Sequence, residues 1–459
     1  MKIANKTVTA ERLVKDALEK AEHFKDYNIF TFINKEAALK KAREIDARIK
    51  KGEKVGRLAG VPYALKDNFL SPEGQTTASA HILEGFNSPV TATAVAKLEA
   101  EGAIMIGRTN LDAFAHGSST ENSYYGPTLN AFDKKRVAGG SSGGSAVAVA
   151  LDIVEFATGT DTGGSIRQPA SFNGIYGLKP TYGTISRYGV VAMASSTDCI
   201  GFFTKTPDDM DLLMSIASGQ DPNDMTTLPD YYNSTDSQKN VSSVRIGIIK
   251  DFDNDSVHPE IRKALSNKVE LLESKGHEIV ELEMPTLKYG LAAYYILVPA
   301  EVASNLSRHD GVRYGFRSQK SESIDALYEK TRDEGFMPEN KRRIMIGNFV
   351  LSSGFYDAYF LKAAKARTLI VKEYEKAFSK CDYILTPVSP NPAFKLGEKV
   401  DDPVAMYLED VMSVSLNLAG VPGLTIPAGK TADGLPVGLQ LVGPRRSDKN
   451  LIEFSKELA

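Results

Sequence analysis

The chain has 459 residues, of which 42% are hydrophobic and 25% are charged, and its formal net charge is −3 at pH 7. These values are typical of a globular enzyme and argue against general nucleic-acid binding, so we expect any nucleic-acid contact to be local or left to a partner. Its two cysteines, Cys199 and Cys381, lack C-x-x-C spacing, which argues against a disulfide framework or a zinc site and favours a reducing compartment.

The N-terminal stretch MKIANKTVTAERLVKDALEKA lacks the apolar core of a signal peptide. No apolar run approaches the roughly eighteen residues that cross a bilayer. We therefore expect a cytoplasmic protein.

The first part of the chain alternates helical and strand patterns. Asn34 is the expected N-cap of the second helix and Gly52 its end. The first strand leads directly into Lys66, and the side chain of Asp67 is expected to point to the opposite face. The expected helices cover residues 9–24, 35–51 and 91–101, and the expected strands cover residues 58–65 and 103–106.

A Gly/Ser-rich stretch follows, with GGSSGGS at residues 139–145 and TDTGGS at residues 160–165. Between them, residues 146–151 read as a buried helix that turns into a short strand over 153–158. Glycine-rich loops bring backbone N–H groups close to a ligand. Two such loops at the ends of one buried element are expected to point two serine hydroxyls into one cleft.

This stretch has three other interpretations. Gly/Ser runs are most often flexible connectors, but these are short and interrupted by helix- and strand-forming residues. A phosphate-binding loop is disfavoured, because no G-x-x-x-x-G-K-[ST] occurs. Residues 139–143 match G-x-S-x-G, but that motif must leave a buried strand, and Asp-Lys-Lys-Arg stands just upstream.

The alternation of helix and strand continues in the second half. Thr206-Pro207 is a strong helix start, and a mainly helical cover is expected over about 292–380. We predict an α/β fold of one domain over 1–459, with a central mixed, largely parallel β-sheet covered by helices on both faces. Further strands are expected at residues 244–249, 279–282, 383–387 and 423–427, with a helix at 260–274.

The six histidines are scattered and form no H-E-x-x-H motif. If a serine is the nucleophile and no histidine is its base, another group must take the proton. A lysine can do so when it is neutral, because burial disfavours its charged form and lowers its pKa.

The Gly/Ser-rich stretch, together with GVPYALKDN at residues 60–68, GRTNLDAFAHGSSTENS at 107–123 and NLAGVPGLTIP at 417–427, resembles the amidase signature family. The resemblance covers nearly the whole chain. GSSTENS and PTYGTISRYG are similar to the branch that forms the A subunit of glutamyl/aspartyl-tRNA amidotransferases. The family uses a serine nucleophile, a bridging serine and a lysine.

This resemblance implies roles for individual residues. Lys66 matches the lysine base, Ser141 the bridging serine and Ser165 the nucleophile, and the peptide bond that enters Ser141 is expected to be cis. The backbone N–H groups of residues 162–165, which are Thr162, Gly163, Gly164 and Ser165, are expected to bind the oxyanion.

For the substrate, the resemblance implies glutamine. Arg343 matches the arginine that binds the α-carboxylate, with Arg342 as its immediate neighbour, and Asp410 matches the aspartate that binds the α-amino group. Two positions depart from the branch pattern: Ala138 stands where proline is common, and His116 where methionine is common, near the expected glutamine pocket.

The implied function is that of a glutaminase subunit, which supplies ammonia to convert Glu-tRNA(Gln), Asp-tRNA(Asn) or both to the amide. The implied partners are a B subunit, which uses ATP and Mg, and a small C subunit, with mischarged tRNA reached through the complex and no cofactor, metal or membrane for this chain. The alternatives are a stand-alone amidase of the same family and a catalytically idle scaffold. The intact Lys66, Ser141 and Ser165 argue against the scaffold.

Overall fold

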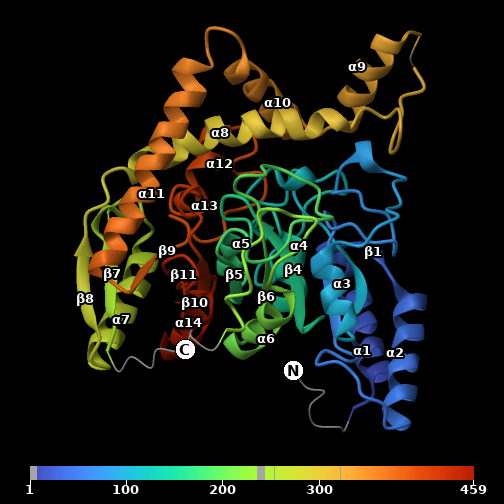
Figure 1. Ribbon diagram of the computed structural model, residues 1–459, viewed down its shortest axis with the longest axis horizontal. Coiled ribbons are helices and arrows are strands. Elements are labelled where there is room, and N and C mark those ends of the chain that lie inside the picture. The colour runs from blue at the N-terminus through green and yellow to red at the C-terminus, as the bar shows by residue number, and fades with distance from the viewer. Residues whose placement is uncertain (1–7, 235–242, 253, 321, 459) are drawn as a thin grey trace.

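The computed structural model describes residues 8–234, 243–252, 254–320 and 322–458. It is built around one 11-stranded sheet (Figure 1). The strands are β1 (Phe30–Ile33), β2 (Pro62–Lys66), β3 (Ile104–Thr109), β4 (Phe156–Asp161), β5 (Tyr176–Lys179), β6 (Cys199–Thr204), β7 (Arg245–Ile249), β8 (Glu278–Leu282), β9 (Tyr383–Pro387), β10 (Gly423–Lys430) and β11 (Pro436–Val442). Their order across the sheet is β1-β3-β2-β4-β6-β5-β10-β11-β9-β7-β8.

The α/β class and the mixed sheet are confirmed, but the expectation of largely parallel pairing is wrong. Among the described residues, six of the ten strand pairings are antiparallel. The parallel pairings join β2 to β3 and β4, and β7 to β8 and β9. Every antiparallel pairing includes β1, β5, β6 or β11, and none of these four strands was expected from the sequence.

The helices begin close to where the sequence patterns place them. Thr206 caps α6 by accepting a hydrogen bond from the Asp209 N–H, with Pro207 in the first turn. Asn34 precedes α2, but its amide donates to Glu73 instead of capping the helix, so that expectation is corrected. The helices are α1 (Ala10–His23), α2 (Lys35–Lys50), α3 (Thr93–Ala100), α4 (Gly143–Ala150), α5 (Arg167–Phe172), α6 (Pro207–Ala217), α7 (Pro259–Ser274), α8 (Gly290–Asn305), α9 (Ile324–Gly335), α10 (Pro338–Leu351), α11 (Lys362–Lys380), α12 (Pro403–Leu408), α13 (Val414–Ala419) and α14 (Asp448–Ser455).

Helices pack on both faces of the sheet, because strand side chains alternate between two hydrophobic layers. On β2, Tyr63 and Leu65 join a cluster with residues of α3, α6 and α14. Ala64, which lies between them, joins a cluster with residues of α1, α2 and α4. The central strands are therefore buried on both sides.

The region over residues 292–380 contains α9, α10, α11 and most of α8; α8, α9 and α10 run across one end of the sheet, and α11 runs down beside β7 (Figure 1). Helix α8 packs against both α10 and α11. This arrangement brings Tyr294 of α8 next to Gly163, in the loop after β4, and Asn340 of α10 to Ala113, in the segment after β3. Within the described part of the chain, no helix is long and apolar enough to span a membrane.

Candidate active site

Lys66 is the last residue of β2, and its side chain is completely buried. Its Nζ lies 2.8 Å from each of three hydroxyl oxygens, those of Ser141, Ser142 and Thr160. No carboxylate of the described residues forms an ion pair with it. Asp67 points to the other face, as expected, and pairs with Arg108 at 3.3 Å.

Burial lowers the pKa of Lys66 to about 7, although Asp112, Asp161 and Asp198 favour its charged form from a distance. A substantial share of the amine is therefore neutral near pH 7. A neutral amine that contacts a serine hydroxyl is able to accept its proton, which is the property required of a base.

Ser141 lies on the loop between β3 and α4, and the Gly140–Ser141 peptide bond is cis, as the resemblance implied. The Asp112 N–H donates to the Ser141 carbonyl at 3.2 Å. A side chain at Gly140 would collide with the Asp112 carboxylate and the Ser119 backbone. Glycine at this position thus lets the loop pack closely enough to bring Ser141 to Lys66.

Ser165 lies on the neighbouring loop, between β4 and α5. The Ser142 N–H donates to the Ser165 carbonyl at 3.3 Å, so the two Gly/Ser loops are in direct contact. The Ser165 hydroxyl is partly exposed and has no hydrogen bond to any residue that the structure describes. The structure therefore brings Lys66 and Ser141 into contact and places Ser165 beside them with its hydroxyl free.

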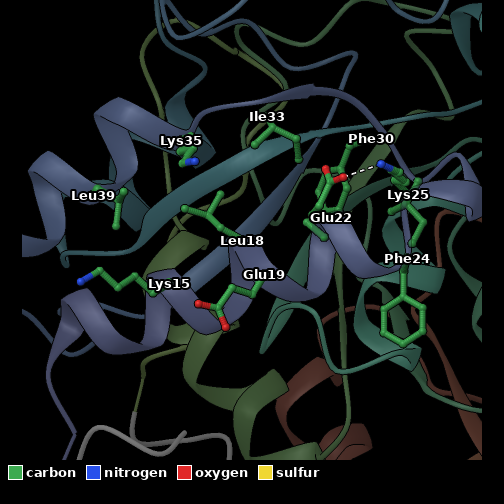
Figure 2. Close-up of a pocket in the computed structure, with 12 residues that line it drawn as sticks. Lys15, Leu18, Glu19, Glu22, Phe24, Lys25, Phe30, Ile33, Lys35 and Leu39 are labelled. Atoms are coloured by element: carbon green, nitrogen blue, oxygen red, sulfur yellow. Dashed lines mark hydrogen bonds and ion pairs between the residues drawn. The ribbon is translucent and has the colours of Figure 1, made fainter.

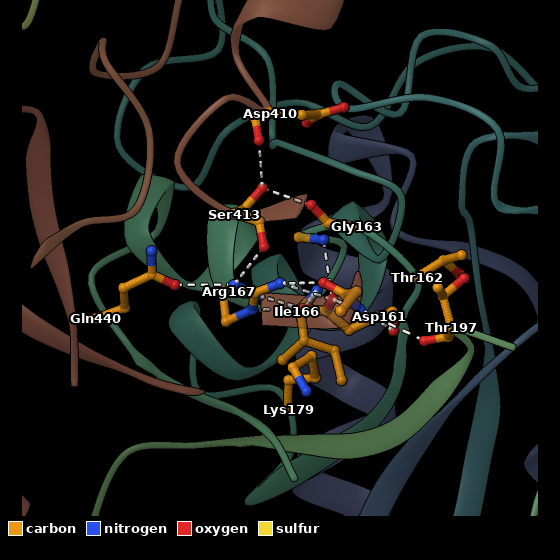
Figure 3. Close-up of polar contacts among 12 residues, drawn as sticks. Asp161, Thr162, Gly163, Ile166, Arg167, Lys179, Thr197, Asp410, Ser413 and Gln440 are labelled. Carbon is orange, nitrogen blue, oxygen red and sulfur yellow. Dashed lines mark hydrogen bonds and ion pairs between the residues drawn. The ribbon is translucent and has the colours of Figure 1, made fainter. Parts of the chain in front are cut away.

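The Ser165 loop is organised by Asp161, the last residue of β4 (Figure 3). Its carboxylate accepts hydrogen bonds from the N–H groups of Gly164 (2.8 Å) and Ile166 (3.1 Å), and from the Arg167 guanidinium. Burial alone would raise the pKa of Asp161, but Arg167, together with Lys179 and Asn417, outweighs it and lowers the value to about 2. A charged carboxylate thus fixes the turn that presents Ser165.

The conformation of this turn argues against one of the four expected oxyanion donors, the Gly164 N–H. The Gly164 N–H is already used by Asp161, whereas the N–H groups of Thr162, Gly163 and Ser165 have no acceptor among the described residues. A Cβ at Gly163 would collide with the phenol of Tyr294. The geometry favours Thr162, Gly163 and Ser165 as the donors.

Asp410 and Arg343 come from distant segments and are joined by Tyr295 of α8. The Tyr295 hydroxyl donates to Asp410 Oδ2 at 2.7 Å, and its ring centroid lies 5.2 Å from Arg343 Cζ. The Ser118 hydroxyl donates to Asp410 Oδ1 at 2.8 Å. Burial raises the pKa of Asp410 to about 6, although these two hydrogen bonds oppose the shift.

Arg343 is buried in α10, and its Nε donates to Glu339 Oε1 at 2.8 Å. Its two terminal nitrogens have no hydrogen bond to the described residues, so the outer edge of the guanidinium is open to a ligand. Arg342 also pairs with Glu339, but its side chain is 42% exposed, against 4% for Arg343. Of these two neighbours, Arg343 is the one that faces the interior.

Arg343 lines a cavity of about 220 Å³ together with Asp112, His116, Ser118, Glu339 and Tyr407. The cavity thus lies between the Ser118 loop and α10. The contacts of Tyr295 and Glu339 were not expected from the sequence, because nothing in the local pattern of α8 or α10 marks these side chains as facing a site.

A second cavity, of about 690 Å³, lies between α1, β1 and the start of α2 (Figure 2). Leu18, Phe30 and Leu39 form apolar parts of its wall, and Lys15, Glu19 and Glu22 of α1 line it as well. None of the expected site residues lines it. In the part of the chain that the structure covers, no group of His, Cys, Asp and Glu side chains is arranged to hold a metal ion.

Comparison with known proteins gives a consistent result. Residues 12–452 match the family model described as Amidase. The chain is 47% identical to the A subunit of the glutamyl-tRNA(Gln) amidotransferase of Carboxydothermus hydrogenoformans, over 99% of this chain and 94% of that protein. It is 50% identical to the protein of the same name from Persephonella marina, over 92% and 87%. The crystal structure of the corresponding A subunit from Thermotoga maritima aligns with a TM-score of 0.80 and 39% identity, over 96% of this chain and 90% of that one.

Proposed function

The chain belongs to the amidase family, and from that premise we propose that it is the glutamine-hydrolysing subunit of a tRNA-dependent amidotransferase. The observation that carries the proposal is the contact of the buried Lys66 amine with the Ser141 hydroxyl, beside the free hydroxyl of Ser165. The full-length similarity to A subunits of glutamyl-tRNA(Gln) amidotransferases supports the choice of branch.

In this proposal, Ser165 Oγ attacks the side-chain amide carbon of glutamine while its proton passes to Ser141, whose own proton passes to Lys66. The N–H groups of Thr162, Gly163 and Ser165 bind the oxyanion, and each donor of this kind contributes on the order of 10²–10³ in rate. Lys66 returns the proton through Ser141 to the leaving nitrogen, and ammonia departs. Water then hydrolyses the acyl-enzyme to glutamate.

Two charged residues bind the two charged groups on the α-carbon of glutamine. The open edge of the Arg343 guanidinium suits a carboxylate, and the Asp410 carboxylate suits an ammonium group. Tyr295 links these two side chains, which gives them a fixed spacing. Amides that lack either charge would leave a buried group unpaired and bind poorly.

The ammonia released at this site is used by a partner subunit. We assign the activation of glutamate or aspartate on mischarged tRNA, with its ATP and Mg, to a B subunit, and we include a small C subunit in the complex. The word "subunit" in the names of the relatives supports a multi-subunit assembly. Because its final substrate is charged tRNA, we place the complex in the cytoplasm.

The proposal is tested by purifying the chain alone and with candidate B and C subunits. We expect glutamate release from glutamine, and glutamine-dependent amidation of Glu-tRNA(Gln) or Asp-tRNA(Asn) only in the complex. Rapid hydrolysis of small aryl amides with no turnover of glutamine in either form would instead identify a stand-alone amidase.

A further inference from the structure

His116 is a fully buried residue that the mechanism above does not use. It follows the short helical turn Ala113–Ala115 and lines the cavity that contains Arg343. Its Nε2 atom is buried and has no hydrogen-bond partner among the described residues. A buried polar atom without a partner is uncommon in folded proteins and requires an explanation.

The position of the proton on the His116 ring follows from its neighbour Asn340. The Asn340 Oδ1 accepts from the Met337 N–H at 3.2 Å, and its Nδ2 donates to the Ala113 carbonyl at 2.8 Å. These two contacts fix the orientation of the amide, because the reverse orientation would oppose donor to donor and acceptor to acceptor.

The same Nδ2 lies 2.6 Å from His116 Nδ1, so Nδ1 is an acceptor and carries no proton. Burial and the nearby Arg343 lower the pKa of His116 well below its usual value, so the ring is neutral. A neutral imidazole without a proton on Nδ1 has it on Nε2. The atom that lacks a partner is therefore an N–H donor.

We infer that His116 is a specificity residue that donates a hydrogen bond from Nε2 to a carboxylate held in this cavity by Arg343. His116 and Arg343 line the same cavity, and an occupant that supplies an acceptor would satisfy both the open guanidinium edge and the Nε2–H that lacks a partner. This inference rests on the proposed function, in which that carboxylate is the α-carboxylate of glutamine. Because His116 is neutral, it adds directionality without adding charge.

Ligands that carry only one of the two groups on the α-carbon of glutamine separate this role from a structural one. Glutaramate keeps the carboxylate and lacks the amino group, whereas 4-aminobutanamide keeps the amino group and lacks the carboxylate. In the assembled complex, kcat/KM is measured for glutamine and inhibition constants are measured for both analogues. The variants are His116→Met, which removes the donor, and His116→Gln, whose amide nitrogen is able to replace Nε2.

We expect His116→Met to weaken glutamine and glutaramate about tenfold or more and to leave 4-aminobutanamide unchanged. His116→Gln should recover most of the loss. Equal weakening of both analogues, or equal defects in both variants, would overturn the inference and show that His116 only supports the fold. Absence of glutaminase activity in the unmodified complex would instead contradict the proposed function.

Discussion

Tyr295 holds Asp410 and Arg343 in one arrangement: its hydroxyl donates to Asp410 at 2.7 Å, and its ring lies 5.2 Å from the Arg343 guanidinium carbon. The Tyr295 ring also stacks on Tyr407, with centroids 3.9 Å apart, and the Tyr407 hydroxyl donates to Glu339, the partner of Arg343. The two side chains proposed to bind glutamine, Arg343 and Asp410, are thus connected through two aromatic rings and a carboxylate. Neither charge is free to move independently.

Tyr295→Phe removes the hydroxyl and keeps the ring. We expect KM for glutamine to rise about tenfold, with a smaller effect on kcat, because Asp410 loses one of its two hydroxyl donors. The Tyr295 hydrogen bond lowers the pKa of Asp410, so its loss raises that pKa and moves the acid limb of kcat/KM to higher pH. Tyr289→Phe, at an exposed position just before α8, is the matched control and should change nothing.

The pH dependence of the unmodified protein follows from two groups. Lys66 acts as a base only when it is neutral, and its pKa is about 7. Asp410 binds an ammonium group only when it is charged, and its pKa is about 6. Activity, measured as kcat/KM for glutamine, should therefore rise about tenfold per pH unit below pH 7, more steeply below pH 6, and level off above pH 7. A flat profile between pH 5.5 and 8 would be incompatible with these roles.

Lys66→Arg tests whether the lysine must lose its proton. Arginine keeps the positive charge but cannot deprotonate at working pH. We expect Lys66→Arg and Lys66→Ala to lose glutaminase activity to a similar extent, on the order of 10²–10⁴ in kcat. Near-normal turnover by Lys66→Arg would show that Lys66 acts as a fixed charge or a structural residue.

Arg343→Ala and Asp410→Ala should each raise KM for glutamine strongly, with some loss of kcat, since remote binding energy also supports the transition state. Both variants should still allow Ser165 to react with a small activated acyl probe. Arg342→Ala is the matched control, because Arg342 is the exposed neighbour and pairs with the same Glu339. If Arg342→Ala has the larger effect, the two arginines have been assigned in the wrong order.

The fold was predictable where helices and strands alternate. All four parallel pairings join strands that the sequence patterns anticipated, because each lies next to a helix of recognisable period. The antiparallel pairings were missed because each includes β1, β5, β6 or β11, which were not recognised in the sequence, and β1 and β5 have only four residues each. Their partners are also distant in sequence: Leu178 of β5 pairs with Leu424 of β10.

The site, like the fold, could be predicted only in part. The roles of Lys66, Ser141 and Ser165 were inferred from motifs, and they stay predictions until activity is measured. The contacts that support them join distant segments, as when Arg167 donates to Asn417 from 250 positions away. Local patterns carry no information on such pairs. The hydrogen bond from the Gly164 N–H to Asp161 could not be predicted from the sequence, because it depends on the conformation of the turn.

The central claim is that Ser165 is the nucleophile that releases ammonia for a partner. It is tested most directly by comparing glutamine with ammonium chloride as the nitrogen donor for amidation of mischarged tRNA by the complex that carries Ser165→Ala. We predict that the glutamine-dependent product is abolished and the ammonium-dependent product is kept at the level of the unmodified complex. Retained glutamine-dependent amidation in that variant would contradict the account.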